Sequence, residues 1–311
     1  LCASLSSNQS LTFIVQSFFS LGAVSAVELE KTFCRAKNAQ PSPTGALVAL
    51  GFAGNTLGVE GGKELARYTH QSYTLTRLDA ARNGFGSAAG VALAGAIRMN
   101  RGLVYLDLSQ NCLGSKAGRA IALALRENET LTSLEAADNG FGPDVLRDFS
   151  TSLGVAPQLI FLGLAKIPFG VQSFEGGSSA GIGEVLGGAL AKNRTLTSLD
   201  LSGGTGLKSI DVLGLLAGFA ENRSLVHVNL DDVEFDDACV LHLTNSLDRQ
   251  RRRVRTNARP VSRGTAAAAL MNYGGLAESR ISEGLVSVSL KNCHLGARAG
   301  PVAAGALISL P

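Results

Sequence analysis

A Leu-x-x-Leu pattern starts again and again along this chain, and over much of its length the starts lie 28 residues apart. The eight starts are Leu47, Leu75, Leu103, Leu131, Leu159, Leu196, Leu225 and Leu285. A fixed period between 20 and 50 residues is typical of a repeat architecture, in which each repeat is one supersecondary unit. The pattern therefore predicts stacked repeats that share one template.

The fullest copy, LVYLDLSQNCLGSKAGRAIALALRENET, begins at Leu103 and predicts a short strand, a turn and a helix. In a strand the side chains alternate between two faces, so Leu106 points inward while Tyr105 and Asp107 point outward. Asn111 follows at the turn, where a buried amide side chain can satisfy backbone groups that leave the strand. Apolar residues at helical spacing then predict a helix that packs on the strands.

One such unit cannot bury its apolar side alone, whereas stacked units can. The sequence therefore predicts an α/β solenoid shaped as a curved horseshoe arc, with a parallel inner sheet, outer convex helices and about 8 to 9 repeats. The expected strand centres are Leu50, Leu78, Leu106, Leu134, Leu162, Leu199 and Val228.

These residues resemble the intracellular, ribonuclease-inhibitor-like family of leucine-rich-repeat proteins. The resemblance rests on the motif L-x-x-L-x-L-x-x-N-x-L-G, on the 28-residue period and on an Asn-x-Thr/Ser-Leu joint between units. The joint recurs at Asn8, Asn128, Asn193 and Asn222. Four later copies depart from the motif at the turn asparagine, which is replaced by Ile167, Gly204, Val233 and Cys293. Those four turns are expected to be locally irregular.

The same four Asn-x-Thr/Ser sites could also be glycosylation acceptors in a secreted protein. Their recurrence at one structural joint explains them without a sugar, and we favour that interpretation. Five cysteines, with no C-x-x-C pair, predict reduced buried thiols rather than a disulfide framework.

The chain is expected to form one solenoid over residues 1–311, with loop insertions near 37–44, 171–183 and 248–283. Leu1 and Leu5 match the helical positions of Ile121 and Leu125, so the sequence begins inside a helix. Solenoids usually end in polar capping repeats, and neither end has that character. We therefore expect a fragment of a longer polypeptide, or ends that are covered by neighbouring molecules.

Composition narrows the possible functions. The 311 residues are 45% hydrophobic and 17% charged, which predicts a folded protein, and the net charge of +3 is too small to indicate nucleic acid or a membrane as partner. His70, His227, His242 and His294 lack metal-ligand spacing. Glycine-rich strings at 175–181 and 202–206 lack the lysine and Ser/Thr ending of a phosphate loop. We expect no enzyme, cofactor, metal or small-molecule substrate.

The outward positions of the predicted sheet are the candidate protein-binding site. An acidic column comprises Asp79, Asp107, Glu135 and Asp200, and larger side chains two positions earlier in their repeats are Tyr105, Phe161 and His227. Neighbouring carboxylates repel one another, so a basic partner would be attracted there. Alternatively, acidic residues at this position belong to the family's ordinary repeat, with Arg77 and Arg82 compensating them in part.

A second candidate surface is the basic insertion. It begins with Arg249, Arg251, Arg252, Arg253 and Arg255. It could dock an acidic partner such as tubulin tails or RNA phosphates, or it could be a solvated, disordered loop.

The resemblance implies a cytoplasmic, non-enzymatic scaffold that binds other proteins of a large assembly. Cilia and flagella use many such repeats, so an axonemal complex, with tubulin or axonemal proteins as partners, is one expected setting. Two alternatives come from the same family. One is a Ran-type GTPase-activating protein, whose acidic tail is not found in this sequence, and the other is the sensor region of an innate immune receptor.

Overall fold

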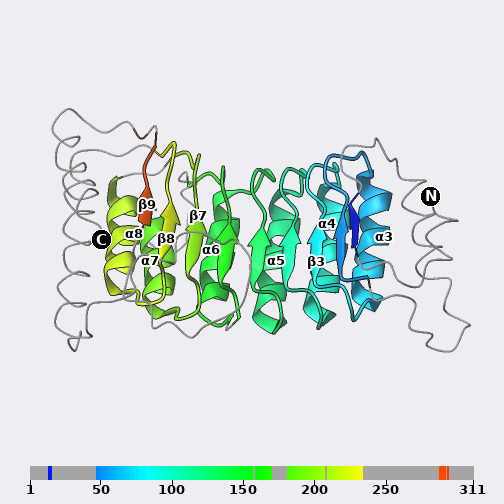
Figure 1. Ribbon diagram of the computed structural model, residues 1–311. Coiled ribbons are helices and arrows are strands. Elements are labelled where there is room, and N and C mark those ends of the chain that lie inside the picture. Colours follow the sequence, from blue (N-terminus) through cyan, green and yellow to red (C-terminus); the bar gives the residue numbers. More distant parts are fainter. Residues whose placement is uncertain are drawn as a thin grey trace, which may run out of the picture.

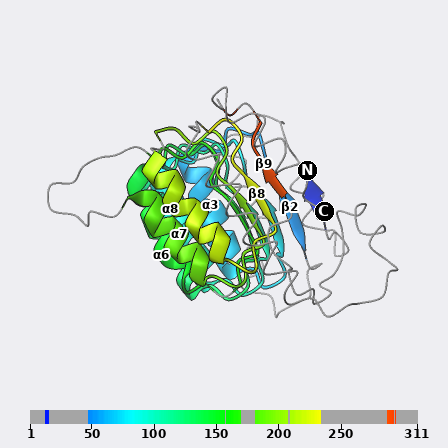
Figure 2. The ribbon, with the colours of Figure 1, turned by 90° about the vertical axis from the view of Figure 1, so that its left-hand side faces the viewer.

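In a computed structural model, the described residues are 13–15, 47–156, 158–169, 181–206, 209–233, 287–291 and 293. Figure 1 shows strands side by side along the molecule, with helices behind them. Turned by 90°, Figure 2 shows two layers, one of strands and one of helices. We call the strand face turned away from the helices the concave face, and the outer face of the helices the convex face.

The strands of the described residues form one nine-stranded parallel sheet in which sequence order equals spatial order. They are β1 (Phe13–Val15), β2 (Ala49–Gly51), β3 (Arg77–Asp79), β4 (Tyr105–Asp107), β5 (Ser133–Glu135), β6 (Phe161–Gly163), β7 (Ser198–Asp200), β8 (His227–Asn229) and β9 (Ser287–Ser289). Each predicted strand centre lies in the middle of its strand, and Leu106 pairs directly with Leu134. The predicted α/β leucine-rich-repeat solenoid is confirmed.

Helices follow the strands from β2 to β7. They are α3 (Gly58–Gln71), α4 (Gly86–Met99), α5 (Gly114–Glu127), α6 (Pro143–Leu153), α7 (Ile182–Lys192) and α8 (Ser209–Glu221). The first three begin at a glycine with positive φ, between 62° and 68°, a conformation that glycine adopts without steric cost. The repeated Leu-Gly or Phe-Gly pair thus marks the point where the turn becomes a helix.

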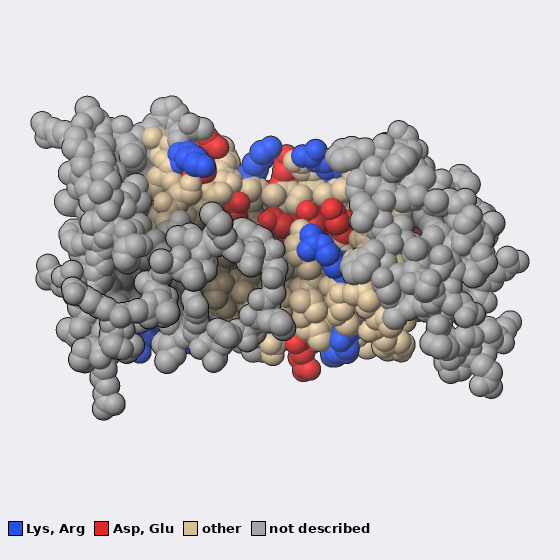
Figure 3. Space-filling model, viewed as in Figure 1, with Lys and Arg blue, Asp and Glu red and all other residues tan. Residues whose placement is uncertain are grey.

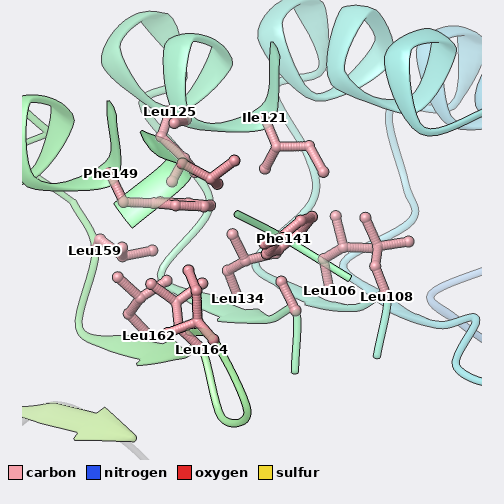
Figure 4. Close-up of a cluster of buried hydrophobic side chains, with 14 of the residues drawn as sticks. Leu106, Leu108, Ile121, Leu125, Leu134, Phe141, Phe149, Leu159, Leu162 and Leu164 are labelled. Carbon is pink, nitrogen blue, oxygen red and sulfur yellow. The ribbon is translucent and has the colours of Figure 1, made fainter. Parts of the chain in front are cut away.

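The core is a continuous set of leucine layers between the sheet and the helices. Leu106 and Leu134, in neighbouring strands, are 1% and 0% exposed. In Figure 4 they lie on the side of the sheet that faces Ile121 and Phe149 of the helices. Each layer therefore receives side chains from adjacent repeats, and one repeat's core is completed by the next.

A ladder of buried asparagines joins the turns of successive repeats. Asn111 Nδ2 donates to the carbonyls of Leu108, 2.9 Å away in its own repeat, and of Ala80, 2.9 Å away in the preceding repeat. Its Oδ1 accepts the backbone N–H of Asn83 at 2.8 Å. The N–H of Asn111 in turn donates to Asn139 Oδ1 at 2.9 Å. Each amide therefore satisfies backbone groups of two repeats at once.

The next repeats replace this ladder with apolar packing. Ile167 occupies the asparagine position and is buried. At the following copy, Gly204 leaves room for the Phe169 ring, because a Cβ at Gly204 would lie 2.8 Å from Phe169 Cδ2. The turns still meet through backbone hydrogen bonds, such as that from Lys166 N to the Ser202 carbonyl at 2.7 Å. At these two turns, apolar side chains thus replace the buried asparagine amide, while backbone hydrogen bonds still connect the neighbouring turns.

A second set of asparagines lies where each helix leads into the next strand. Asn128 Nδ2 donates to the Ile97 carbonyl at 2.7 Å, and its Oδ1 accepts the N–H groups of Thr130 at 2.9 Å and Leu131 at 2.7 Å. Asn193 and Asn222 make equivalent bonds and are also buried. This confirms the structural interpretation of these three joints, while Asn8 lies outside the described residues.

The described residues test only some of the predictions for loop insertions and cysteines. Residues 37–44, 171–180 and 248–283 lie outside the described residues, and α7 begins at Ile182. Cys112 is exposed, so the prediction of buried thiols was wrong there, because Cys112 occupies an outer turn position with φ of 54°. Cys293 is half-buried, and Cys2, Cys34 and Cys239 are not described.

We expect Leu106→Ala to lower the free energy of unfolding by about 2–5 kcal/mol, because it opens a cavity in a layer shared between repeats. Chemical denaturation measures this. Val104→Ala, two residues away and 41% exposed, is the matched control. Equal stability of the two variants would contradict the inward register of Leu106.

Asn111→Ala should destabilise the protein by at least about 2 kcal/mol, since it leaves buried backbone groups in two repeats without a hydrogen-bond partner. Its effect on the denaturation midpoint can be compared with that of Lys116→Ala, at an exposed position of α5. A midpoint as high as that of the control would show that the ladder contributes little.

Candidate protein-binding surface

The parallel register places the predicted acidic residues in one row across the concave face. Asp79, Asp107 and Glu135 occupy equivalent positions of β3, β4 and β5. Gly163 interrupts the row in β6, and Asp200 continues it in β7. Figure 3 shows acidic side chains gathered in a band across the middle of this face, with basic side chains at its upper and lower edges and one directly below the band. The structure thus brings all four predicted carboxylates together in what we call the acidic row.

The aspartates of the acidic row also stabilise the turn that follows each strand. Asp107 Oδ1 accepts the N–H of Ser109 at 2.8 Å, and Asp200 Oδ1 accepts that of Ser202 at 2.8 Å. Asp79 makes a longer bond of 3.3 Å to the N–H of Ala81. These side chains are half-buried, whereas the sequence pattern predicted exposed ones. Asp200 also accepts the side-chain N–H of Asn229 through Oδ2, at 3.1 Å. This structural role is compatible with binding, because a carboxylate that accepts hydrogen bonds keeps its negative charge.

Glu135 has a different environment from the aspartates. Its carboxylate lies over Gly163, so that a Cβ there would be 2.5 Å from Glu135 Cδ. The pKa of Glu135 is raised from 4.5 to about 7, first by burial and then by the charges of Asp107 and Asp200. A glycine on the neighbouring strand therefore allows the longest acid of the row to lie flat against the sheet.

The larger side chains form a second row, two residues before the acidic one. The Arg77 guanidinium lies 3.6 Å from the centroid of the Tyr105 ring, a cation–π arrangement. Burial raises the pKa of Tyr105, and the charge of Asp107 adds to that, whereas Arg77 lowers it. Phe161 is half-exposed and His227 is exposed. The register separates these residues by Ser133 and Ser198, so the row alternates between large and small side chains.

Arg77 compensates the negative charge of Asp79, as expected, but its effect is small. Burial raises the pKa of Asp79, the N–H of Ala81 lowers it, the charge of Asp107 raises it, and Arg77 lowers it least. At the turns, Lys166 forms an ion pair of 2.8 Å with Asp138, outside the acidic row. Among the described residues, the charge of Asp79 is therefore only weakly compensated by Arg77.

A third row, one residue after each repeat start, was not predicted from the sequence. It comprises Val48, Thr76, Val104, Thr132, Ile160, Thr197 and Val226, all of them β-branched. The recurrence of β-branched residues at this template position was the signal that could have revealed it. We call it the β-branched row. The second row, with Tyr105 and Phe161, lies between the β-branched row and the acidic row.

Other site types find no support in the part of the chain that the structure describes. Among those residues, no three His, Cys, Asp or Glu side chains come together as a metal site. The helices described include none long and apolar enough to cross a membrane. The candidate docking loop at Arg249, Arg251, Arg252, Arg253 and Arg255 lies outside the described residues.

Glu135 should make stability depend on pH. Its pKa of about 7 in the folded protein exceeds the ordinary value of 4.5, so between these values the folded state holds a proton that the unfolded state has lost. This contribution to stability falls as pH rises through that window. Between about pH 5 and about pH 8, the melting temperature of Glu135→Gln should therefore fall less than that of the parent. Glu129→Gln, at an exposed position, should behave as the parent does. If the melting temperatures of all three proteins changed in parallel with pH, the raised pKa of Glu135 would be refuted.

Comparison with known proteins supports the repeat assignment. Residues 100–122 and 192–209 match the leucine rich repeat family. A search of curated protein sequences gives no match. Among solved structures, the chain is similar to LegL7 from Legionella pneumophila, a leucine-rich repeat-containing protein, with 19% identity, coverage of 79% of this chain and 83% of that one, and a TM-score of 0.46.

Two further similarities are weaker. The leiomodin-1 actin-binding site 2 shares 17% identity over 55% of this chain and 79% of its own, with a TM-score of 0.32. The tropomodulin C-terminal domain of Caenorhabditis elegans shares 13% identity over 52% and 93%, with a TM-score of 0.38. Similarity at this level does not bear on binding or activity. The matched repeats, their 28-residue period and the parallel sheet backed by helices show that the chain folds as a leucine-rich-repeat solenoid.

Proposed function

We propose that this chain is a non-enzymatic scaffold that binds another protein on the concave face of its sheet. The observation that carries the proposal is the acidic row, whose four carboxylates lie at equivalent positions of β3, β4, β5 and β7 in one rigid sheet. A surface that is ordered before binding loses little conformational entropy when the partner arrives. The partner segment that fits best is basic, because it would relieve the repulsion among the carboxylates.

The repeat subtype that we propose is the ribonuclease-inhibitor-like one. It is supported by the 28-residue period, by the 14-residue helices α3, α4 and α5, and by the buried turn asparagines. Membership of a large cytoplasmic assembly, including a ciliary or axonemal one with tubulin or axonemal partners, is proposed from the family resemblance alone. The GTPase-activating and immune-sensor alternatives stay as predictions that no described residue favours.

At about pH 8, where Glu135 with its pKa of about 7 is mostly ionised, removing two charges from the acidic row should weaken partner binding. Asp107→Asn/Glu135→Gln retains the oxygen that Ser109 N–H uses, so the fold should persist while the attraction for a basic partner falls. Capture of the native assembly from its source by tagged protein, at increasing salt, measures the effect. The parent should capture its partner with strong salt dependence, and the variant should capture less with weaker salt dependence.

The control variant is Glu127→Gln/Glu129→Gln, which removes the same charge at exposed positions outside the acidic row. A deletion of residues 249–263 tests the competing basic insertion. Unchanged capture by Asp107→Asn/Glu135→Gln, together with loss of capture in the deletion, would move the binding site to the insertion.

A further inference from the structure

The β-branched row is more apolar than its composition suggests. Thr76 Oγ1 donates to the Val48 carbonyl at 3.1 Å, and Thr132 Oγ1 donates to the Val104 carbonyl at 3.2 Å. Thr197 repeats this bond to the preceding strand at 3.3 Å. The hydrogen of each of these threonine hydroxyls is therefore donated to the chain's own backbone, and only the oxygen can still accept a bond from a partner. Between them Val104 and Ile160 are 41% and 47% exposed, so the row offers aliphatic surface to a partner.

Two chemically different rows thus run parallel across the same strands. In each repeat the β-branched residue comes three positions before the acidic one, as Val104 does before Asp107, so the rows lie about 10 Å apart along the strand. An α-helix with its side chains is about 10–12 Å wide. A helix laid across the strands would therefore cover both rows, with Tyr105 and Phe161 of the intervening row beneath its centre.

The spacing along the rows also favours a helix over an extended peptide. Neighbouring strands are about 4.8 Å apart, so Asp107, Glu135 and Asp200 lie about 4.8, 9.6 and 19.2 Å from Asp79 along the row. Helix residues i+3, i+7 and i+14 share a face with residue i and lie about 4.5, 10.5 and 21 Å along the axis. Same-face residues of an extended peptide fall at about 6.6, 13.2 and 19.8 Å. The first two lie between carboxylates and only the third matches one, at Asp200, whereas all three helix positions lie within about 2 Å of a carboxylate.

We propose that the partner segment of the concave face is an amphipathic α-helix that crosses the strands, with basic residues over the acidic row and aliphatic residues over the β-branched row. This inference rests on the proposed function and deepens it, because it specifies the secondary structure and the two-sided chemistry of the partner. The aliphatic stripe of the helix lies about one residue, or 100°, around from the basic stripe.

Synthetic peptides test this directly on the full chain. The probe is an 18-residue, alanine-based, fluorescent peptide with lysines at positions 1, 4, 8 and 15 and a leucine directly after each lysine. A shuffled peptide of the same composition spreads both residue types around the helix. A third peptide alternates lysine and leucine at the period of two of a strand. Fluorescence anisotropy gives the three affinities, and circular dichroism reports helix gained on binding.

We expect the helix-patterned peptide to bind at least about fivefold more tightly than the other two and to gain helicity when bound. Asp107→Asn/Glu135→Gln and Val104→Ser/Ile160→Ser should each weaken its binding by about fivefold, as each removes contacts from one stripe. Glu127→Gln/Glu129→Gln should bind as the parent does. Thermal melts confirm that each variant is folded.

Several results would overturn the inference. These are equal affinity for the patterned and shuffled peptides, tightest binding of the strand-patterned peptide, absence of binding by the patterned peptide, or binding that Val104→Ser/Ile160→Ser leaves unchanged. If Asp107→Asn/Glu135→Gln weakens the binding of all three peptides equally, the partner segment is basic but not helical. The proposed function then stands without the helix. Failure of the proposed function itself is seen separately, in the capture of the native assembly.

Discussion

The sharing of buried asparagine side chains between neighbouring repeats is the constraint on which the first half of this solenoid depends. A turn that leaves a strand exposes backbone N–H and carbonyl groups that cannot be left unpaired in the interior. The side-chain Nδ2 of Asn111 donates to carbonyls in its own and in the preceding repeat, and its side-chain Oδ1 accepts the backbone N–H of Asn83. Because the bonds cross from repeat to repeat, the turns are held at one spacing, and the strand register follows from it.

The register in turn produces the functional surface. Once Leu106 is paired with Leu134, every outward position is aligned too, and a sequence period becomes a row of like side chains. Where asparagine is absent, Phe169 against Gly204 and the backbone bonds between turns keep the alignment. The acidic row therefore continues to Asp200 although apolar residues replace the turn asparagines there. This alignment has an electrostatic cost at Glu135, where the charges of Asp107 and Asp200 add to burial in raising the pKa of the carboxyl group.

Much of this could be predicted from the sequence, since one period determines strand, turn and helix. The inward direction of Leu106 and the alignment of Asp79, Asp107 and Glu135 follow from alternation and spacing alone. The details that depend on neighbours in space could not be predicted. The flat position of Glu135 requires Gly163 in the next strand, and the packing of Phe169 requires Gly204 in the next turn. The half-burial of the aspartates follows from their bonds to turn N–H groups, and the exposure of Cys112 from an outer turn position.

The concave face is the central claim, and site-specific photo-crosslinking tests it most directly. A photoreactive amino acid at Ser133 or Ser198 would lie between the acidic and β-branched rows, whereas one at Leu123 would lie on the exposed surface of α5. Irradiation of the native assembly, followed by mass spectrometry of the adducts, shows which face meets a partner. The account predicts adducts to the same partner protein from Ser133 and Ser198 and none from Leu123. Adducts from Leu123, with none from the two serine positions, would contradict it.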